Sequence, residues 1–244
     1  MPNALIVYAH PEPKSFNGAM KDIAVKTLPQ AGYKVRVSDL YGMGWNPVSD
    51  RENFETVKDD SYFKQQVEEQ YAFENKGFAE DVQEELDKLL WCDLLLFQFP
   101  LWWFGLPAIL KGWCDRVLAM GPTYGYGRMY DKGVFTGKKA ALALTTGGPD
   151  TMYSEFGMNG AMHDVLFPIN HGILYFVGFT PLEPFITYQP ARLTDEQRAA
   201  ELERYRQHLL NVDSAKTLNY LGFDAYDDKM ILKDKTLVGK HAGR

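Results

Sequence analysis

The chain has 244 residues, and its 26 Lys and Arg against 32 Asp and Glu give a net charge of -6 at pH 7. Folding at this length buries about three quarters of the surface of the unfolded chain, which is enough for one large core. The basic residues form no run that could neutralise a row of phosphates, so we expect no nucleic-acid partner. The N-terminus lacks the basic stretch and the long apolar core of a secretory signal, and we expect a cytoplasmic protein.

Two features invite other interpretations, and the sequence argues against both. Cys92 and Cys114 are too few for a disulfide scaffold and lack the spacing of a metal site, so we expect buried, reduced thiols and no metal. Residues 94–110 carry no charge and come near the length of a membrane span, which needs about 20 apolar residues. Pro and Gly residues interrupt this run three times, which favours a strand, a turn and a helix start and indicates no membrane span.

Strands and helices alternate along the chain. Short apolar or alternating runs predict strands over residues 4–9, 33–40, 94–99, 138–146 and 183–188. Helical spacing predicts helices over residues 18–28, 78–91, 107–120, 162–176 and 194–211, with a break near Pro168 and a cap at Thr194. Such alternation is typical of a doubly wound α/β domain with helices on both faces of a parallel sheet. The long connection over residues 41–76 has a weak pattern, and its length favours a role in a site or an interface.

Three loops are candidates for a site, because ligands of such sheets bind beyond the C-terminal ends of the strands. After the first strand comes HPEPKSFNGA, where Ser15 or Asn17 can cap a helix whose amides, with Lys14, can bind an anion. After the third comes PLWWFG, whose aromatic side chains can form a flat bed for a planar ring. After the fourth comes TTGG, where glycines allow close approach of the backbone. Each loop alone is also explained as a capped turn, a hydrophobic plug or an ordinary turn, but together the three suit a flavin.

Seven stretches carry a family resemblance: ALIVYAHPEPKSFN, SDLYGMGWNP, FQFPLWWFGLPAILKGW, MYDKGVF, KKAALALTTGG, MYSEFG and GFTPLEP, in this order. They resemble the NAD(P)H:quinone reductases of the DT-diaphorase type, a flavodoxin-like family that includes bacterial drug-activity modulators. The resemblance implies a five-stranded parallel sheet in the order 2-1-3-4-5. It also implies a flavin-binding domain of residues 1–211 and a C-terminal extension of residues 212–244 that packs on the domain or on the dimer partner.

The same resemblance implies a function. The family binds FAD tightly, and FMN is the less favoured cofactor for this chain. The active site of the family lies where the two subunits of a homodimer meet. NADH or NADPH gives a hydride to the flavin and leaves, and a quinone then takes the same place and receives the hydride. The sequence leaves open the physiological acceptor and the choice between NADH and NADPH.

The resemblance assigns residues of this chain to three roles. The cofactor-binding positions are His10, Lys14, Ser15, Phe16, Asn17, Ala19, Pro100, Leu101, Trp102, Trp103, Phe104, Thr145, Thr146, Gly147, Gly148, Tyr153, Arg198 and Leu202. The substrate-pocket positions are Trp103, Phe104, Tyr124, Tyr126, Met129, Met152, Phe176 and Arg192. The catalytic positions are Gly147, Gly148, Tyr153 and Asn159. Core or interface packing also explains the side chains that close the substrate pocket.

The chain departs from the family pattern at Asn159, where the family has a catalytic histidine six residues after the tyrosine. Asparagine can donate a hydrogen bond but cannot take up a proton near neutral pH, so the usual Tyr/His pair cannot operate with Tyr153. His163 lies four residues further on and is a candidate replacement. Two other family positions match Arg192 and Lys64, which add positive charge and favour a negatively charged acceptor or nucleotide. Two alternatives stay open: a regulatory flavoprotein subunit of a membrane transporter, and an FMN-dependent azo- or nitroreductase.

Overall fold

A parallel β-sheet forms the middle layer of the computed structural model, which describes residues 1–241. Its strands are β1 (Asn3–Tyr8), β2 (Lys34–Asp39), β3 (Leu94–Pro100), β4 (Lys139–Thr146), β5 (Thr180–Pro181) and β6 (Phe185–Tyr188). The order is β2-β1-β3-β4-β5, and β6 also pairs with β4. The predicted doubly wound sheet and its order 2-1-3-4-5 are therefore confirmed. The edge beyond β4 consists of two short strands, where the sequence predicted a single one.

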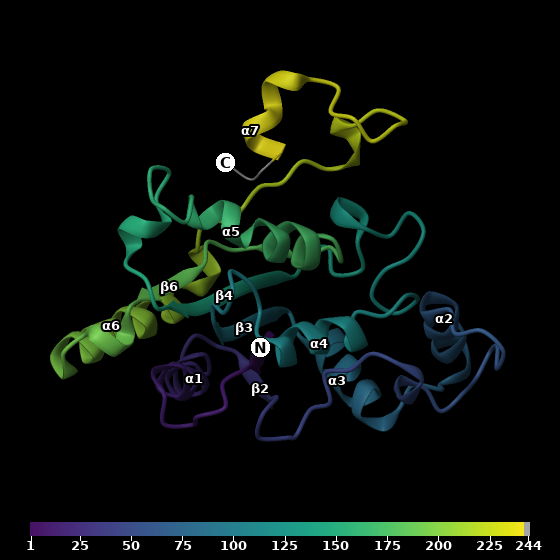
Figure 1. Ribbon diagram of the computed structural model, residues 1–244, viewed down its shortest axis with the longest axis horizontal. Coiled ribbons are helices and arrows are strands. Elements are labelled where there is room, and N and C mark those ends of the chain that lie inside the picture. Colours follow the sequence, from purple (N-terminus) through teal and green to yellow (C-terminus); the bar gives the residue numbers. More distant parts are fainter. Residues whose placement is uncertain (242–244) are drawn as a thin grey trace.

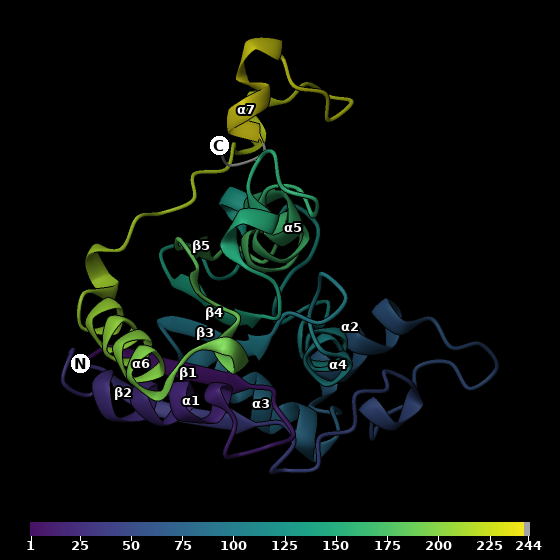
Figure 2. The ribbon, with the colours of Figure 1, turned by 60° about the vertical axis from the view of Figure 1, so that its left-hand side comes forward.

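Helices cover both faces of the sheet (Figures 1 and 2). The α-helices are α1 (Phe16–Thr27), α2 (Gln65–Asn75), α3 (Glu80–Trp91), α4 (Ala108–Val117), α5 (Met162–Ile169), α6 (Asp195–Leu210) and α7 (Val238–His241). One core lies under α1 and α6 and includes Ile6 of β1, and the other lies under α3, α4 and α5 and includes Leu5. Successive residues of a strand point to opposite faces, so β1 supplies both cores. Strand β3 is buried at every position, which explains its continuous apolar run.

Helix α2 lies in the connection that the sequence pattern left uninterpreted. Its buried side includes Glu68 and Glu69, which are 2% and 3% exposed. The Glu68 carboxylate accepts hydrogen bonds from the backbone N–H groups of Lys58 and Asp59 at 2.7 and 2.9 Å. These bonds make burial of the charge tolerable, since a buried carboxylate must be hydrogen-bonded. The periodicity of apolar residues does not predict this helix, because its buried side carries glutamates.

The helix after β4 does not end at Pro168. Helix α5 includes this proline and continues as the π-helix η4 (Asn170–Tyr175). Proline has no N–H group to bond one turn back and crowds the carbonyl there, and the helix widens directly after it. The predicted break is therefore a change of helix type. Thr194 caps α6 as predicted: its hydroxyl accepts the backbone N–H of Gln197 at 3.3 Å, and its own backbone N–H donates to Gln197 Oε1 at 2.9 Å.

The chain after α6 crosses the β5 edge and reaches the α5 side of the molecule (Figure 2). The N–H of Leu218 donates to the carbonyl of Pro181 at 2.8 Å, and the Tyr220 ring lies 5.0 Å from the His171 ring. The remainder, including α7, projects beyond the rest of the molecule in both views (Figures 1 and 2). The boundary at residue 211 stays a prediction, and residues 242–244 of the predicted extension lie outside the described part.

Two other expectations concern burial and membranes. Cys92 and Cys114 are buried and free, as predicted. Burial raises the pKa of the Cys92 thiol to about 12 and also raises that of Cys114, so both thiols stay protonated at neutral pH. Within residues 1–241, no helix combines the length and the apolar character that crossing a membrane requires.

Candidate active site

The loops after β1, β3 and β4 line one pocket, which we name the strand-end pocket. Its cavity volume is about 480 Å³. The lining residues are His10, Lys14, Ser15, Phe16, Asn17, Pro100, Leu101, Trp102, Thr145, Thr146, Gly147, Gln189, Pro190, Ala191, Arg192 and Arg198. Twelve of the predicted cofactor positions are therefore together. Arg192, predicted for the substrate pocket, belongs to the same cavity, and the sequence did not single out Gln189–Ala191.

The β1–α1 loop gives the pocket an end suited to an anion. Ser15 caps α1, and its hydroxyl accepts the N–H of Gly18 at 3.1 Å. The N–H groups of Phe16 and Asn17 have no partner within residues 1–241, as expected for the first turn of a helix. His10 Nδ1 lies 3.0 Å from the Glu12 nitrogen and 3.2 Å from the Glu12 carbonyl oxygen, so it can accept from the first or donate to the second. The two amides offer donors to a negative group, and His10 Nε2 adds a third in the tautomer whose Nδ1 accepts the Glu12 N–H.

A strained aromatic turn follows β3. Trp102 and Gly105 exchange two backbone hydrogen bonds of 3.2 and 3.0 Å across a two-residue turn. The turn residues Trp103 and Phe104 have φ angles of 50° and 59°, a region that bulky residues rarely adopt. Turns of this kind ordinarily use Asn and Gly. The Trp103 side chain is 97% exposed. Backbone strain that holds an aromatic side chain in the open is a feature of functional sites.

The β4 loop supplies the polar edge. Thr146 Oγ1 donates to the Gly148 carbonyl at 2.8 Å, which closes the loop on itself. A Cβ atom at Gly148 would lie 3.2 Å from the Tyr153 ring and 3.3 Å from Met152 Sδ, so these side chains would have to shift by a few tenths of an ångström to admit one. At Gly147 a Cβ atom would meet nothing within 4 Å. The glycines therefore have different tasks: Gly148 accommodates Tyr153, and Gly147 leaves space in the pocket.

Buried polar side chains support the pocket wall. Asn17 Nδ2 donates to Thr145 Oγ1 at 2.8 Å, and Gln98 Nε2 donates to Asn17 Oδ1 at 3.0 Å. The Tyr205 hydroxyl on α6 donates to Gln98 Oε1 at 3.2 Å. Sequence reasoning missed Gln98 and Tyr205 as part of the site. Gln98 was nevertheless visible as the single polar side chain of its apolar run.

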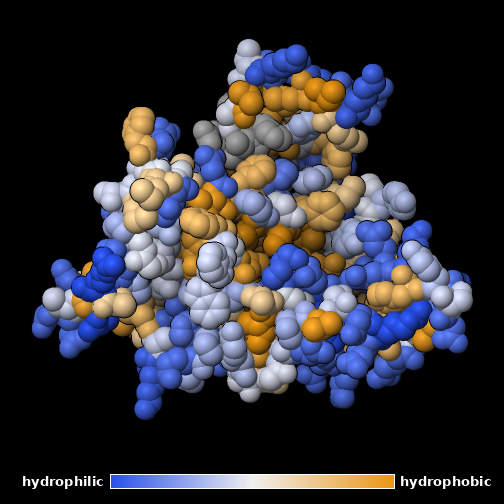
Figure 3. Space-filling view, in the orientation of Figure 1, coloured by the Kyte–Doolittle hydropathy of each residue, from blue (hydrophilic) through white to orange (hydrophobic). Residues whose placement is uncertain are grey.

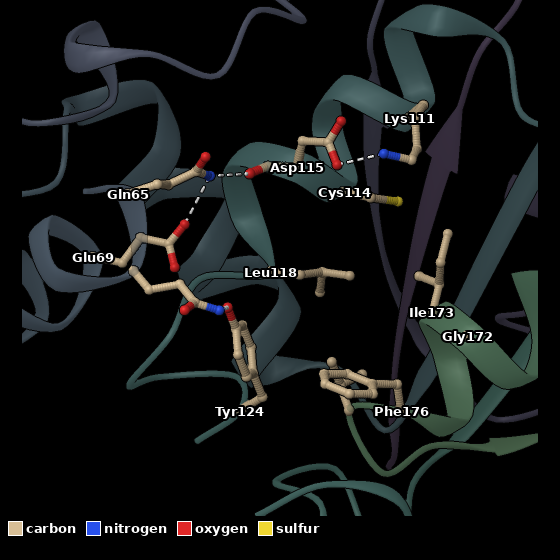
Figure 4. A pocket seen from close by; sticks show the side chains of 12 residues that line it. Gln65, Glu69, Lys111, Cys114, Asp115, Leu118, Tyr124, Gly172, Ile173 and Phe176 are labelled. Atoms are coloured by element: carbon tan, nitrogen blue, oxygen red, sulfur yellow. Dashed lines mark hydrogen bonds and ion pairs between the residues drawn. The ribbon is translucent and has the colours of Figure 1, made fainter. Parts of the chain in front are cut away.

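A second cavity of about 470 Å³ lies between α2, α4 and η4, and we name it the tyrosine cavity (Figure 4). The Tyr124 and Phe176 rings meet there at 5.5 Å, and Gln66 Nε2 donates to the Tyr124 hydroxyl at 3.2 Å. Burial raises the pKa of Tyr124. Apolar residues gather in the middle of the face shown in Figure 3, around the position of α5. The cavity therefore combines the aromatic rings of Tyr124 and Phe176 with polar and charged side chains of α2 and α4.

The other predicted positions are not in these two cavities. Tyr153 lines a third cavity of about 420 Å³ together with His163, whose Nδ1 lies 3.2 Å from Asp164 Oδ1. Asn159 is half-buried, and its backbone N–H donates to the Met152 carbonyl at 2.9 Å. Three of the remaining positions are exposed aromatic residues: Trp103, Phe104 and Tyr126. Leu202 packs against the core under α1 and α6. The others lie outside the three cavities: Ala19, Met129, Met152, Gly148 and Lys64.

Comparison with known proteins identifies the family. Residues 2–209 match the family described as flavodoxin-like fold, and the chain belongs to this family. It is 44% identical over 225 residues to NAD(P)H dehydrogenase (quinone) 1 of Rattus norvegicus, covering 92% of this chain and 82% of the relative. It is 43% identical over 209 residues to ribosyldihydronicotinamide dehydrogenase (quinone) of Homo sapiens, covering 85% of this chain and 90% of the relative. The resemblance to the quinone reductases is confirmed by these relatives.

A solved structure agrees with this relationship. A Klebsiella pneumoniae protein, provisionally described as a quinone reductase, is 36% identical and superposes with a TM-score of 0.90. The match covers 96% of this chain and 94% of that chain. It therefore includes most of the segment after α6.

Proposed function

We propose that the protein is an FAD-dependent NAD(P)H:quinone oxidoreductase. In this reaction NAD(P)H and one proton reduce a quinone to a hydroquinone and leave NAD(P)⁺, and bound FAD supplies the hydride transfer in two successive half-reactions. The observation that carries the proposal is the strand-end pocket, where three loops meet with the chemistry that a flavin needs. The names of the two relatives support the same reaction.

The residues of the strand-end pocket fit FAD in three parts. The free amides of α1, with His10 and Lys14, suit the pyrophosphate. The aromatic turn and the β4 loop suit the ring, which has a flat apolar face and a polar edge. The pocket continues past η5 (Pro190–Arg192) to Arg198. A pocket that extends beyond the phosphate and ring positions favours a dinucleotide, and FAD over FMN.

The polar edge has a catalytic task. Backbone amides of the Thr146–Gly148 loop can stabilise negative charge that develops on the ring edge, because they are held in place before the reaction begins. Tyr153 lies against this loop and carries a hydroxyl donor. Asn159 adds an amide donor in place of an imidazole, so we assign it an orienting role. Proton supply then comes from water or from another group.

The proposed acceptor site lies between two copies of the chain. Trp103 beside the strand-end pocket is 97% exposed, and Tyr126, close to the tyrosine cavity in sequence, is 94% exposed. A second copy would cover such aromatic side chains and exclude water from the ring. In this arrangement one subunit supplies the strand-end pocket and its partner supplies Tyr124, Tyr126 and Phe176.

Anaerobic reduction tests the proposal. The purified protein, supplemented with FAD, is titrated with NADH, NADPH or dihydronicotinamide riboside while the visible flavin band is followed. We expect one of these donors to bleach the band and a simple quinone to restore it. Flavin that none of the donors reduces would contradict the enzymatic function and favour a binding role. Chromatography of the cofactor released by heat separates FAD from FMN, and FMN would favour the azo- or nitroreductase alternative.

A further inference from the structure

A continuous chain of four buried polar side chains ends at the strand-end pocket. It runs from Tyr205 through Gln98 and Asn17 to Thr145, over three hydrogen bonds of 3.2, 3.0 and 2.8 Å. Their exposed fractions are 0%, 0%, 4% and 6%, and they come from α6, β3, α1 and β4. Only Asn17 and Thr145 line the pocket. The chain therefore connects a buried phenol to a hydroxyl group that meets the ligand.

Such a chain can in principle run in either direction, because an amide can turn end for end and a hydroxyl can donate or accept. In the reverse direction Thr145 donates to Asn17, and Gln98 turns its N–H toward Tyr205. The Tyr205 proton then has no acceptor within the described residues. A buried unpaired donor lowers the population of the reverse direction by about 5- to 150-fold.

Two further observations favour the forward direction, in which Tyr205 donates to Gln98, Gln98 to Asn17, and Asn17 to Thr145. Burial raises the pKa of Tyr205, so its hydroxyl keeps the proton that it must donate. Met20 Sδ lies 3.7 Å from Gln98 Nε2 and is a weak acceptor for the second N–H of that amide. Gln98 therefore keeps its oxygen toward the phenol and its nitrogen toward Asn17.

The direction of these hydrogen bonds decides whether Thr145 offers a donor or an acceptor to a ligand in the pocket. The Thr145 oxygen accepts a proton from Asn17, so its own proton is left for the pocket. The neighbouring Thr146 hydroxyl already donates to the Gly148 carbonyl, so it can offer only a lone pair. We infer that Tyr205, acting through Gln98 and Asn17, fixes the Thr145 hydroxyl as a hydrogen-bond donor, and that this edge of the pocket selects a ligand atom that accepts. The inference rests on the proposed function, because FAD is the ligand that this edge of the pocket would bind.

A binding experiment on the full chain tests the inference without measuring turnover. FAD is removed, and its rebinding to the apoprotein is followed by the quenching of flavin fluorescence. Thr145→Val removes the donor and should weaken FAD binding by about fivefold. Tyr205→Phe removes an oxygen outside the pocket and should weaken binding by about two- to fivefold, because part of the population then has the reversed direction of hydrogen bonds.

The decisive result is the double variant. If Tyr205 acts through Thr145, then Tyr205→Phe has no further effect on FAD binding in the Thr145→Val background. Equal loss in both backgrounds would overturn the inference, as would unchanged binding by Tyr205→Phe alone. Tyr33→Phe is the matched control: it removes a phenol that donates to Asp213 Oδ1 at 2.5 Å, and we expect no loss of FAD affinity.

Two checks keep the outcome clear. Thermal unfolding of each apoprotein shows whether it folds, and Gln98→Met replaces Tyr205→Phe if the latter does not, since it breaks the same chain with a side chain of similar size. In Gln98→Met the loss of affinity should again disappear in the Thr145→Val background. Failure of the wild-type apoprotein to bind FAD would refute the proposed function. Normal wild-type binding with additive variants would refute only the inference.

Discussion

The strand-end pocket and the tyrosine cavity differ in how complete they are within one chain. The strand-end pocket has walls of backbone and of buried side chains that bond one another, as Asn17 and Thr145 do. The tyrosine cavity is bordered by exposed polar side chains such as Gln66 and Lys111, and Tyr126 near it points into solvent. The first region is organised to hold a ligand by itself, whereas in the proposed dimer a second subunit would complete the walls of the tyrosine cavity. Cofactor binding and acceptor turnover should therefore respond to different substitutions.

The largest expected effect is at Gly18, in the first turn of α1. A Cβ atom there would lie 1.9 Å from the Pro13 carbonyl oxygen, so the β1–α1 loop must shift in Gly18→Ala. We expect the dissociation constant for FAD to rise by at least about 30-fold, the equivalent of about 2 kcal/mol of overpacking. Fluorescence titration with FAD measures the change, and thermal unfolding should show a lower Tm.

Gly147→Ala is the matched control for this effect. A Cβ atom at Gly147 meets nothing in the protein, so the Tm of the apoprotein should not change. The methyl group would still occupy space in the strand-end pocket, and FAD binding should weaken by about tenfold. Unchanged FAD binding in both variants would mean that the cofactor binds elsewhere.

The second prediction separates the tyrosine cavity from the strand-end pocket. Tyr126→Ala removes an exposed ring, so flavin content and Tm should stay as in the wild type. If the ring closes the acceptor site of a second subunit, the KM for a quinone should rise by about tenfold, in line with the loss of about 1.4 kcal/mol of aromatic contact.

Mixing of subunits tests whether the two regions act across a dimer interface. Gly18→Ala and Tyr126→Ala each damage a different half of the proposed site. Random exchange makes half of the dimers mixed, and each mixed dimer has one intact site, so about a quarter of the wild-type activity should return. No recovery, despite exchange shown by a mass tag, would mean that both regions serve the same subunit.

Sequence analysis could predict the loops of the strand-end pocket but not the residues that distant pairing brings to it. The strand-end loops were predicted because the order of a parallel sheet brings the ends of its strands together. Their chemistry is also local, since Ser15 caps the helix that begins beside it. Gln189–Ala191 escaped prediction because η5 lies on the pocket only through the pairing of β6 with β4, which no short motif encodes. Tyr205 escaped for the same reason: its partner Gln98 is 107 residues away.

The third prediction concerns Asn159, where the resemblance places a histidine. Asn159→His introduces a group that titrates near neutral pH, and the reaction consumes one proton. Turnover of the variant should exceed that of the wild type by about threefold near pH 6 and become equal above about pH 8, because the protonated imidazole is lost there. Asn159→Gln keeps the amide and should leave the pH profile unchanged. Parallel profiles for all three proteins would move attention to His163, which shares a cavity with Tyr153.

The smallest expected effect is on stability and arises at Glu69 beside the tyrosine cavity. Its side chain is 3% exposed, and it accepts the Met120 N–H at 2.7 Å and the Gln65 amide at 2.9 Å. Burial raises the pKa of this carboxyl above its ordinary value of 4.5 despite these bonds. The folded protein therefore holds the proton more tightly than the unfolded chain. As the pH rises through the range between the two pKa values, ionisation removes stability, and the loss is complete above the raised pKa.

Glu69→Gln removes this loss because its amide does not ionise. The Tm of the variant should equal that of the wild type near pH 4 and exceed it by about 2–4 °C at pH 8. Glu68→Gln is the neighbouring control with the opposite expectation: both oxygens of its carboxylate accept backbone N–H groups, whereas Glu69 accepts one backbone and one side-chain donor, so Glu68→Gln would leave a backbone N–H without its acceptor. Flavin content should not change in either variant, because neither residue lines the strand-end pocket. If the Tm of Glu69→Gln is lower than that of the wild type at pH 8, the two hydrogen bonds to the carboxylate outweigh the cost of burying its charge. This edge of the tyrosine cavity would then be more rigid within one chain than its exposed border suggests.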